Sequence, residues 1–133
     1  MSDINTVNPG DPTPEQKNKV GKYLPIYYAG ASGDFNPIHI DPEFGKMVGL
    51  GGNILQGLCT MGFVAKMHTD WAQDPGRLKR LKVRFSKPVL PNDTVVVKGT
   101  VKEKGGGALR CEVWAENQKG EAVITNGESE IEI

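Results

Sequence analysis

The chain has 133 residues, with 16 Lys and Arg against 16 Asp and Glu, 38% hydrophobic residues and 24% charged residues. This length and composition predict one ordinary globular domain with its own hydrophobic core, and they exclude a disordered chain. The balanced charge argues against broad nucleic-acid binding, and no apolar run approaches the roughly 18 residues that a membrane-spanning helix needs.

The amino-terminal stretch, residues 1–22, is polar, carries prolines and glycines and offers few apolar positions. We expect it to form a tail or loosely held lead-in to a domain over residues 23–133. It lacks the apolar core of a secretory signal, and the carboxy-terminal IEI is no retention or peroxisomal address, so a cytoplasmic protein is expected. In that compartment Cys59 and Cys111 are expected to remain reduced thiols.

Helix and loop signals occupy the next part of the chain. The apolar and aromatic residues 24–29 predict a short helix that ends near Gly30 or Gly33. From there to Gly57, turn signals alternate with a short amphipathic piece over residues 43–48, which indicates a structured excursion across the surface. Loops of this kind commonly carry function.

A change of period marks the second half of the chain. Residues 58–68 are apolar on nearly all sides of a helix, which predicts a helix buried on most sides. The remainder alternates apolar and polar residues with a period of two, in runs at residues 80–86, 95–97, 109–115 and 128–133. One buried helix followed by an antiparallel sheet that must cover it predicts an α+β fold in which the sheet wraps around the helix.

The densest group of polar functional residues includes Asp34 and His39, which are separated by a turn at Asn36 and Pro37. Such a turn can bring a carboxylate and an imidazole to one point. There the two groups could hold a water molecule between them and act as a general base and acid pair. The alternative is structural: Asp34 closes the turn, and His39 is a partly buried polar residue.

Residues 28–39, YAGASGDFNPIH, resemble the hydratase-2 motif of the MaoC-like dehydratases, the (R)-specific enoyl-CoA hydratases. The resemblance continues through residues 54–63 and 84–89 and covers about residues 24–133. It implies a single hot-dog fold, in which an antiparallel sheet wraps around a long central helix. It also implies a carbon–oxygen lyase of fatty acid metabolism. Such an enzyme adds water to a trans-2-enoyl thioester of coenzyme A or of an acyl carrier protein, giving the (R)-3-hydroxyacyl thioester, or catalyses the reverse dehydration.

The resemblance also implies roles for individual residues. Asp34 and His39 match the pair that binds and activates the water, and Asn36 is expected to fix the turn and to contact substrate or water. The backbone N–H of Gly57, at the positive end of the central helix, is suited to meet the charge that builds on the thioester oxygen. Gln56 stands where the family usually has His, and its amide can keep a supporting contact to substrate without titrating. Gly57 could instead serve only as a tight turn into the helix, and Asn36 could be purely structural.

Other signals in the sequence are weaker. Six basic residues between positions 77 and 87 indicate a solvated strand face, or a contact with coenzyme A phosphates or with the acidic surface of an acyl carrier protein. No cofactor and no metal are expected, because the histidines and nearby aspartates lack the compact spacing of metal ligands.

A single copy of this fold would leave a sheet edge and one face of the central helix uncovered. We therefore expect a homodimer, or a heterodimer with a related hot-dog subunit in which this chain, bearing Asp34 and His39, is the catalytic member. Two other functions stay open. One is a non-catalytic acyl-thioester-binding or partner subunit, which Gln56 and the abbreviated amino-terminal region keep open. The other is a hot-dog thioesterase, against which the Gly-Asp-x-Asn-Pro-x-His block argues.

Overall fold

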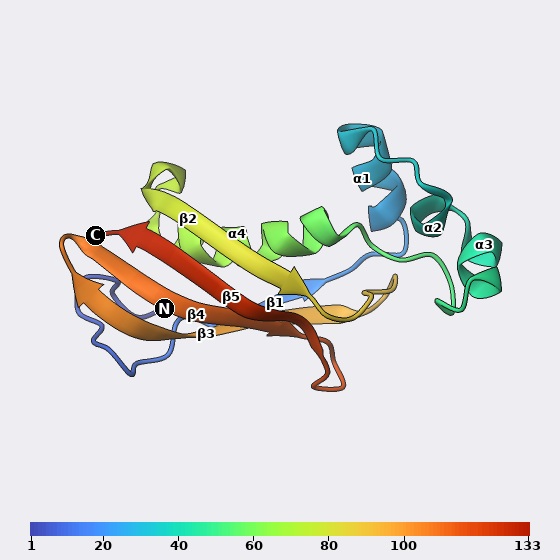
Figure 1. Cartoon of the computed structure of the whole chain (residues 1–133). Helices are drawn as coiled ribbons and strands as arrows, with labels where there is room; N and C mark the ends of the chain where they lie inside the picture. The colour runs from blue at the N-terminus through green and yellow to red at the C-terminus, as the bar shows by residue number, and fades with distance from the viewer.

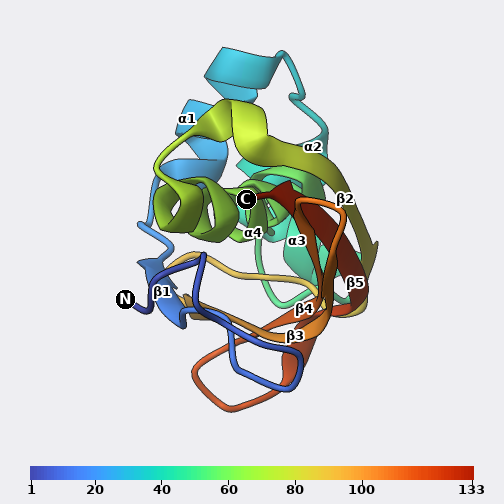
Figure 2. The same cartoon turned by 90° about the vertical axis from the view of Figure 1, so that its left-hand side faces the viewer.

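The computed structural model describes residues 1–133 and consists of a five-stranded antiparallel sheet curved around one long helix (Figures 1 and 2). The strands are β1 (Gln16–Lys19), β2 (Leu78–Phe85), β3 (Thr94–Gly105), β4 (Ala108–Glu116) and β5 (Ala122–Glu132). The helices are α1 (Leu24–Ser32), α2 (Pro37–Ile40), α3 (Pro42–Met47), α4 (Gly57–Ala72) and the 3-10 helix η1 (Pro75–Arg77). The strand order is β1-β3-β4-β5-β2, so that β1 and β2 form the two edges. The predicted α+β hot-dog fold is confirmed.

Helix α4 is covered by the sheet and the core on most of its sides and exposed along one stripe. Its buried residues recur at helical spacing, as expected for a face in contact with a sheet. They are Thr60, Val64, Met67, His68, Trp71 and Ala72. On the other side Gly62 and Lys66 are exposed, and Leu58 is 65% exposed. The helix is therefore covered on most sides and exposed along one stripe, as expected for a single copy of this fold that leaves one face of its central helix uncovered.

The inner face of the sheet supplies most of the core. Alternation along β3 buries Val95, Val97 and Val101 completely, while Val96, Lys98 and Thr100 lie on the other face and are only partly buried. The outer face carries cross-strand ion pairs such as Lys102 with Glu112, at 3.2 Å. Exposed pairs of this kind contribute little to stability, so burial of the apolar inner face is what holds the sheet on α4.

The lead-in expected over residues 1–22 is instead folded onto the sheet. Ile4, Val7 and Val20 are buried in the main core, and β1 pairs along its whole length with β3. The indole N–H of Trp71 donates a hydrogen bond of 2.9 Å to the carbonyl of Ser2. The expectation was wrong because β1, with the sequence QKNK, is a polar edge strand that takes its pairing from β3 and shows no apolar pattern of its own.

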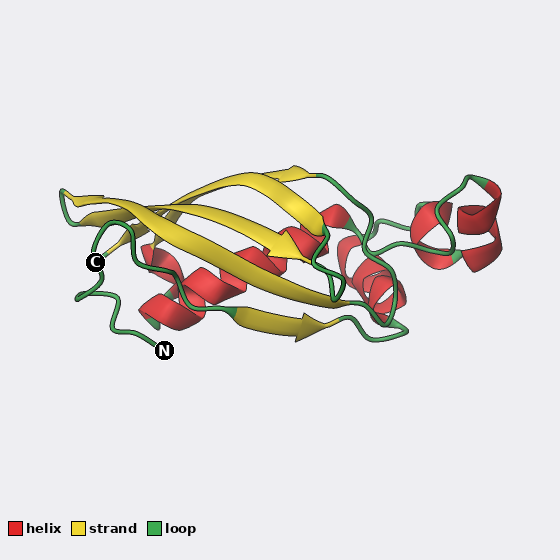
Figure 3. Cartoon of the chain, turned by 90° about the horizontal axis from the view of Figure 1, so that it is seen from below, coloured by secondary structure: helices red, strands yellow, loops and turns green.

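The three short helices α1, α2 and α3 extend beyond the N-terminal end of α4, away from the sheet (Figures 1 and 3). The predicted helix over residues 24–29 is confirmed as α1, which ends at Gly33 in a left-handed conformation, φ 81°. Asp41 then caps α3, where its Oδ1 accepts hydrogen bonds from the backbone N–H groups of Glu43 and Phe44. No helix anywhere in the chain is long and apolar enough to cross a membrane.

Candidate active site

Asp34 and His39 lie side by side at the turn between α1 and α2. Oδ2 of Asp34 is 3.5 Å from Nε2 of His39. Oδ1 of Asp34 accepts a hydrogen bond of 3.3 Å from the backbone N–H of Asn36, and Oδ1 of Asn36 in turn accepts one of 3.2 Å from the N–H of Ile38. The turn is thus held by successive side-chain to backbone bonds, as the Asn-Pro signal indicated. This local geometry places the carboxylate and the imidazole together.

The buried imidazole of His39 is fixed by the segment that leads into α4. Its Nδ1 lies 2.8 Å from the carbonyl oxygen of Ile54. Since a carbonyl oxygen only accepts, Nδ1 carries the hydrogen and donates it. Nδ2 of Asn53 donates to the carbonyl of His39 at 3.0 Å, and the N–H of Ile54 donates to the carbonyl of Ile38 at 2.8 Å. In the neutral ring Nε2 is therefore an acceptor, and it faces Asp34.

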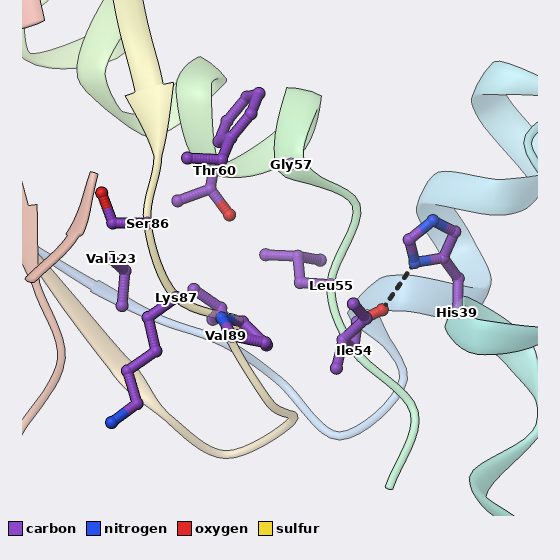
Figure 4. Close-up of a pocket in the computed structure, with 11 residues that line it drawn as sticks. His39, Ile54, Leu55, Gly57, Thr60, Ser86, Lys87, Val89 and Val123 are labelled. Atoms are coloured by element: carbon purple, nitrogen blue, oxygen red, sulfur yellow. Dashed lines mark hydrogen bonds between the residues drawn. The ribbon is translucent and has the colours of Figure 1, made fainter. Parts of the chain in front are cut away.

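A pocket of about 380 Å³ opens beside His39, between the N-terminal end of α4 and the segment that follows β2 (Figure 4). Its walls are His39, Ile54, Leu55, Gly57, Thr60, Phe85, Ser86, Lys87, Pro88, Val89 and Val123. Asp34 stands next to His39 without being one of these walls, and its side chain is 49% exposed. The pair therefore lies at the entrance of the pocket.

Most polar groups in the pocket wall already have partners. Ser86 shares a hydrogen bond of 2.5 Å with Thr125, and Lys87 forms an ion pair with Glu121. The hydroxyl of Thr60 makes no hydrogen bond, although Thr60 is buried, and Figure 4 shows it turned into the pocket. Beyond His39, this hydroxyl is the free polar side-chain group that a bound molecule would meet.

Gly57 is the first residue of α4 and lines the same pocket as His39. Its backbone N–H and that of Leu58 have no partner in the structure, because no earlier helical turn offers them a carbonyl. A Cβ atom built on Gly57 would lie 3.2 Å from the ring of Phe85. The space next to Gly57 is therefore narrow, closed on one side by an aromatic ring and facing the positive end of the helix dipole.

The two predicted substrate-contact residues lie outside the pocket walls. Asn36 caps α2, which agrees with its structural alternative. Gln56 is buried, and its Nε2 donates a hydrogen bond of 3.0 Å to the carbonyl of Pro25 in α1. The structure thus brings Asp34, His39 and Asn36 together on one turn, while the side chain of Gln56 is directed at α1.

Several wall residues were given no functional role from the sequence, among them Thr60 and Phe85. Thr60 follows Gly57 by three positions, and this spacing puts both on one face of a helix, which was the available signal. Phe85 ends β2, and the sequence identified it only as an alternating strand residue and as part of a motif that resembles the family.

The basic stretch between residues 77 and 87 is largely neutralised by neighbours. Lys79 and Arg80 pair with Glu132 and Glu128, both at 3.6 Å. Lys87 pairs with Glu121, and the guanidinium of Arg77 donates to the carbonyls of Glu132 and Ala72. Lys82 and Arg84 form no ion pair, so the interpretation as a solvated strand face fits most of the stretch.

The other metal-capable residues have structural partners. Asp41 caps α3, and His68 is buried against Val64 and Ser129. No group of three or more His, Cys, Asp or Glu side chains gathers in a way that could hold a metal ion. Burial raises the pKa of the Cys59 thiol and raises that of Cys111 to about 11, which makes both thiols poor nucleophiles.

A sheet wrapped around one central helix, with a carboxylate and an imidazole at the entrance of a pocket beside that helix, defines this chain as a hot-dog-fold protein with a candidate acid–base site. Residues 6–123 match the family described as the MaoC like domain. The chain belongs to this family, which confirms the resemblance found in residues 28–39.

Named relatives agree with the family. The chain is 40% identical over 91 residues to the probable enoyl-CoA hydratase 2 of Dictyostelium discoideum, covering 65% of this chain and 31% of that protein. The R-hydratase PhaJ1 of Pseudomonas aeruginosa superposes with a TM-score of 0.82 at 25% identity, covering 96% of this chain and 83% of that one. The ChsH1-ChsH2 complex of Mycobacterium tuberculosis gives a TM-score of 0.83 at 27% identity, with 96% and 98% covered. The chain spans about a third or less of the length of the first curated relatives it matches.

Proposed function

We propose that this protein is a lyase that adds water to a trans-2-enoyl thioester, giving the (R)-3-hydroxyacyl thioester, or catalyses the reverse dehydration. The observation that carries the proposal is the placement of Asp34 Oδ2 at 3.5 Å from His39 Nε2, at the entrance of a pocket. The names of the relatives, an enoyl-CoA hydratase 2 and an R-hydratase, support the same chemistry and the (R) configuration.

The two side chains are suited to orient a water molecule. With Nδ1 of His39 donating to Ile54, Nε2 is an acceptor, and an ionised Asp34 is also an acceptor. A water between them donates one hydrogen to each group, which leaves an oxygen lone pair free to attack carbon 3 of the enoyl chain. Such an arrangement provides general-base assistance at the oxygen that must lose a proton.

The backbone N–H of Gly57 is the proposed partner of the thioester oxygen. Attack at carbon 3 moves electrons onto this oxygen, so a donor already in place stabilises the transition state more than the ground state. The N–H of Gly57 is unpaired and lies at the positive end of α4. One such donor is typically worth about 2.7–4 kcal/mol of the barrier.

The proton that the attacking water releases is taken up, and a proton is returned to the product, within the same site. The hydroxyl of water bonds to carbon 3, and the proton it releases passes to the Asp34 and His39 pair. That pair returns a proton to carbon 2 as the enolate collapses, so that water is added in full and the thioester bond stays intact. The acyl chain is proposed to lie in the pocket past Gly57, among Leu55, Val89 and Val123.

We also propose that two copies of the chain form a homodimer. The edge strand β2 has no partner on its outer side, and Leu58 and Phe85 remain 65% and 53% exposed beside the pocket. Pairing through β2 would cover apolar surface and remove an exposed edge. The ChsH1-ChsH2 complex supports association between subunits of this fold. Light scattering on the purified protein at micromolar concentration is expected to give twice the chain mass, and a stable monomer would overturn this part of the proposal.

The function is tested by mixing the purified protein with crotonyl-CoA. Loss of the enoyl-thioester absorbance without release of free thiol, and abolished by Asp34→Asn, is the expected result. Thiol release would identify a thioesterase instead. No change in absorbance or thiol with enoyl-CoA substrates of any chain length would leave only acyl-thioester binding and overturn the lyase proposal.

A further inference from the structure

Gln56 is a buried amide with one satisfied and one unsatisfied end. Only 2% of the residue is exposed, and Nε2 donates to the carbonyl of Pro25 at 3.0 Å. Oε1 is buried with no hydrogen-bond partner. Because a carbonyl cannot donate, the amide nitrogen must be the end that faces Pro25. An unpaired buried acceptor is costly, so stability alone does not explain an amide at this position.

The residue sits at the junction of the parts that form the site. It is the N-cap residue of α4, directly before Gly57, and its backbone carbonyl accepts from the N–H groups of Cys59 and Thr60. Its side chain reaches Pro25 in the first turn of α1, the helix that leads into the Asp34 turn. The side chain therefore joins the start of α4 to the start of α1.

A neighbouring residue makes the matching connection to the histidine. The carbonyl of Ile54 holds Nδ1 of His39 at 2.8 Å. The short segment that ends in Gly57 thus fixes His39 through Ile54 and the helix leading to Asp34 through Gln56. Neither bond involves the atoms that would touch substrate, but together they determine where the Asp34 carboxylate stands relative to the Gly57 N–H.

We propose that Gln56 is a positioning residue for the hydration reaction, an inference that rests on the function proposed above. Its amide hydrogen bond to Pro25 sets the distance between the Asp34 and His39 pair and the N-terminus of α4. A misplacement of about 1 Å at a reacting centre can cost about 10²-fold in rate, so losing this bond is expected to lower kcat more than it raises KM.

An amide side chain also suits this buried position because it donates a hydrogen bond without carrying a charge. In Gln56→Glu, an ionised carboxylate has no hydrogen to give the Pro25 carbonyl, whereas the protonated acid donates through its O–H. Burial favours the protonated form of the carboxyl. Gln56→Glu is therefore expected to be active at acidic pH and to lose activity as pH rises, an additional pH limb that the parent lacks.

The experiment measures kcat and KM for crotonyl-CoA hydration across pH in the parent, Gln56→Leu and Gln56→Glu. The matched control is Gln16→Leu, because Gln16 also has a buried, unpaired Oε1, while its Nε2 donates to Asp70, on α4 well away from the pocket. For Gln56→Leu we expect kcat to fall at least about tenfold while KM stays within about threefold of the parent. For Gln56→Glu we expect the new pH limb. Gln16→Leu is expected to keep the kinetics of the parent. Gln56→His keeps an N–H donor, so its kcat is expected to be higher than that of Gln56→Leu.

The outcomes separate this inference from the function on which it rests. If the parent hydrates crotonyl-CoA, but Gln56→Leu keeps the parental kcat and Gln56→Glu shows no new pH limb, then the positioning role alone is overturned. A parent that hydrates no enoyl thioester overturns both. Circular dichroism on each variant shows whether it is folded, and if Gln56→Leu fails to fold, the pH profile of Gln56→Glu decides the matter.

Discussion

The carbonyl oxygen of Ile54 accepts a hydrogen bond of 2.8 Å from Nδ1 of His39, 15 positions earlier in the chain. This bond fixes which ring nitrogen carries the hydrogen and leaves Nε2 as an acceptor facing Asp34. A backbone carbonyl on the segment leading into α4 therefore determines the protonation pattern of a side chain on α2. The Asp34 and His39 pair and the start of the central helix form one structural unit.

The first prediction concerns the pair itself. Asp34→Asn and His39→Gln are each expected to lower kcat for crotonyl-CoA hydration by about 10²–10⁴-fold, because each removes one member of a general acid–base pair. Asn keeps an oxygen for the N–H of Asn36, so the turn should survive. Steady-state kinetics with circular dichroism checks this, and Asp70→Asn, on the exposed side of α4, is the matched control. Activity within a few-fold of the parent in either variant would show that the pair does not activate the water.

The second prediction concerns the space beside Gly57. A methyl group there would lie 3.2 Å from the Phe85 ring, which is half exposed and can move aside. Gly57→Ala is therefore expected to fold, while the methyl obstructs the approach of the thioester to the N–H and lowers kcat/KM by about 10²-fold, the scale of losing one such donor.

Gly62→Ala is the control for this substitution. Gly62 is an exposed glycine on the same helix, with nothing near its added Cβ. Replacing it should raise the free energy of unfolding by about 0.5–1 kcal/mol and leave kinetics unchanged. If Gly57→Ala were as active as Gly62→Ala, the thioester oxygen would have to bind elsewhere.

The sequence predicted the parts of the molecule whose pattern is local. Alternation of Val95 and Val97 indicated a strand, and the Asn36-Pro37 turn indicated that Asp34 and His39 come together; both follow from chemistry within a few residues. The pairing of β1 was not predictable in this way, because its polar residues are held by β3 from nearly 80 positions away.

Two further differences arise from tertiary placement. An apolar helix pattern does not distinguish a face buried by the chain's own sheet from a face that the chain leaves exposed, so the sequence alone did not indicate which residues, such as Leu58, lie on the exposed side. The direction of the Gln56 side chain depends on where α1 folds back, 31 residues earlier in the chain. No signal near Gln56 specifies Pro25 as its partner, and the substrate contact expected for Gln56 came from the family resemblance.

A third prediction concerns the free hydroxyl in the pocket. Thr60 is buried, makes no side-chain hydrogen bond and faces the space proposed for the acyl chain. Thr60→Val keeps the shape and replaces a polar group of the pocket wall with a methyl, so KM for unsubstituted enoyl-CoA should fall several-fold while the free energy of unfolding stays near that of the parent. Thr60→Ser is the control that keeps the hydroxyl. A KM that rises tenfold in Thr60→Val would mean that the hydroxyl binds the thioester end of the substrate.

The last prediction concerns a buried histidine outside the site. Nδ1 of His68 lies 2.8 Å from the carbonyl of Val64 and donates to it, and Nε2 accepts from the hydroxyl of Ser129 at 2.7 Å. Burial lowers the pKa of His68 below its ordinary 6.5, and the hydrogen bond to Val64 opposes this only in part. The unfolded chain therefore binds a proton more readily than the folded one as the pH falls below about 6.5. The stabilising contribution of this neutral histidine is complete above that pH and is lost progressively below it.

Urea unfolding at pH 8 and at pH 5.5 measures this contribution. The parent is expected to lose free energy of unfolding between the two values, and the double variant His68→Leu with Ser129→Ala should lose less, because it removes the titrating ring together with the hydroxyl that would otherwise be left unpaired. His39 is present in both proteins, so its contribution cancels in the comparison. Equal losses in the two proteins would assign the acid sensitivity to groups other than His68, whereas a shallower profile in the double variant would trace it to the His68 and Ser129 contact between α4 and β5.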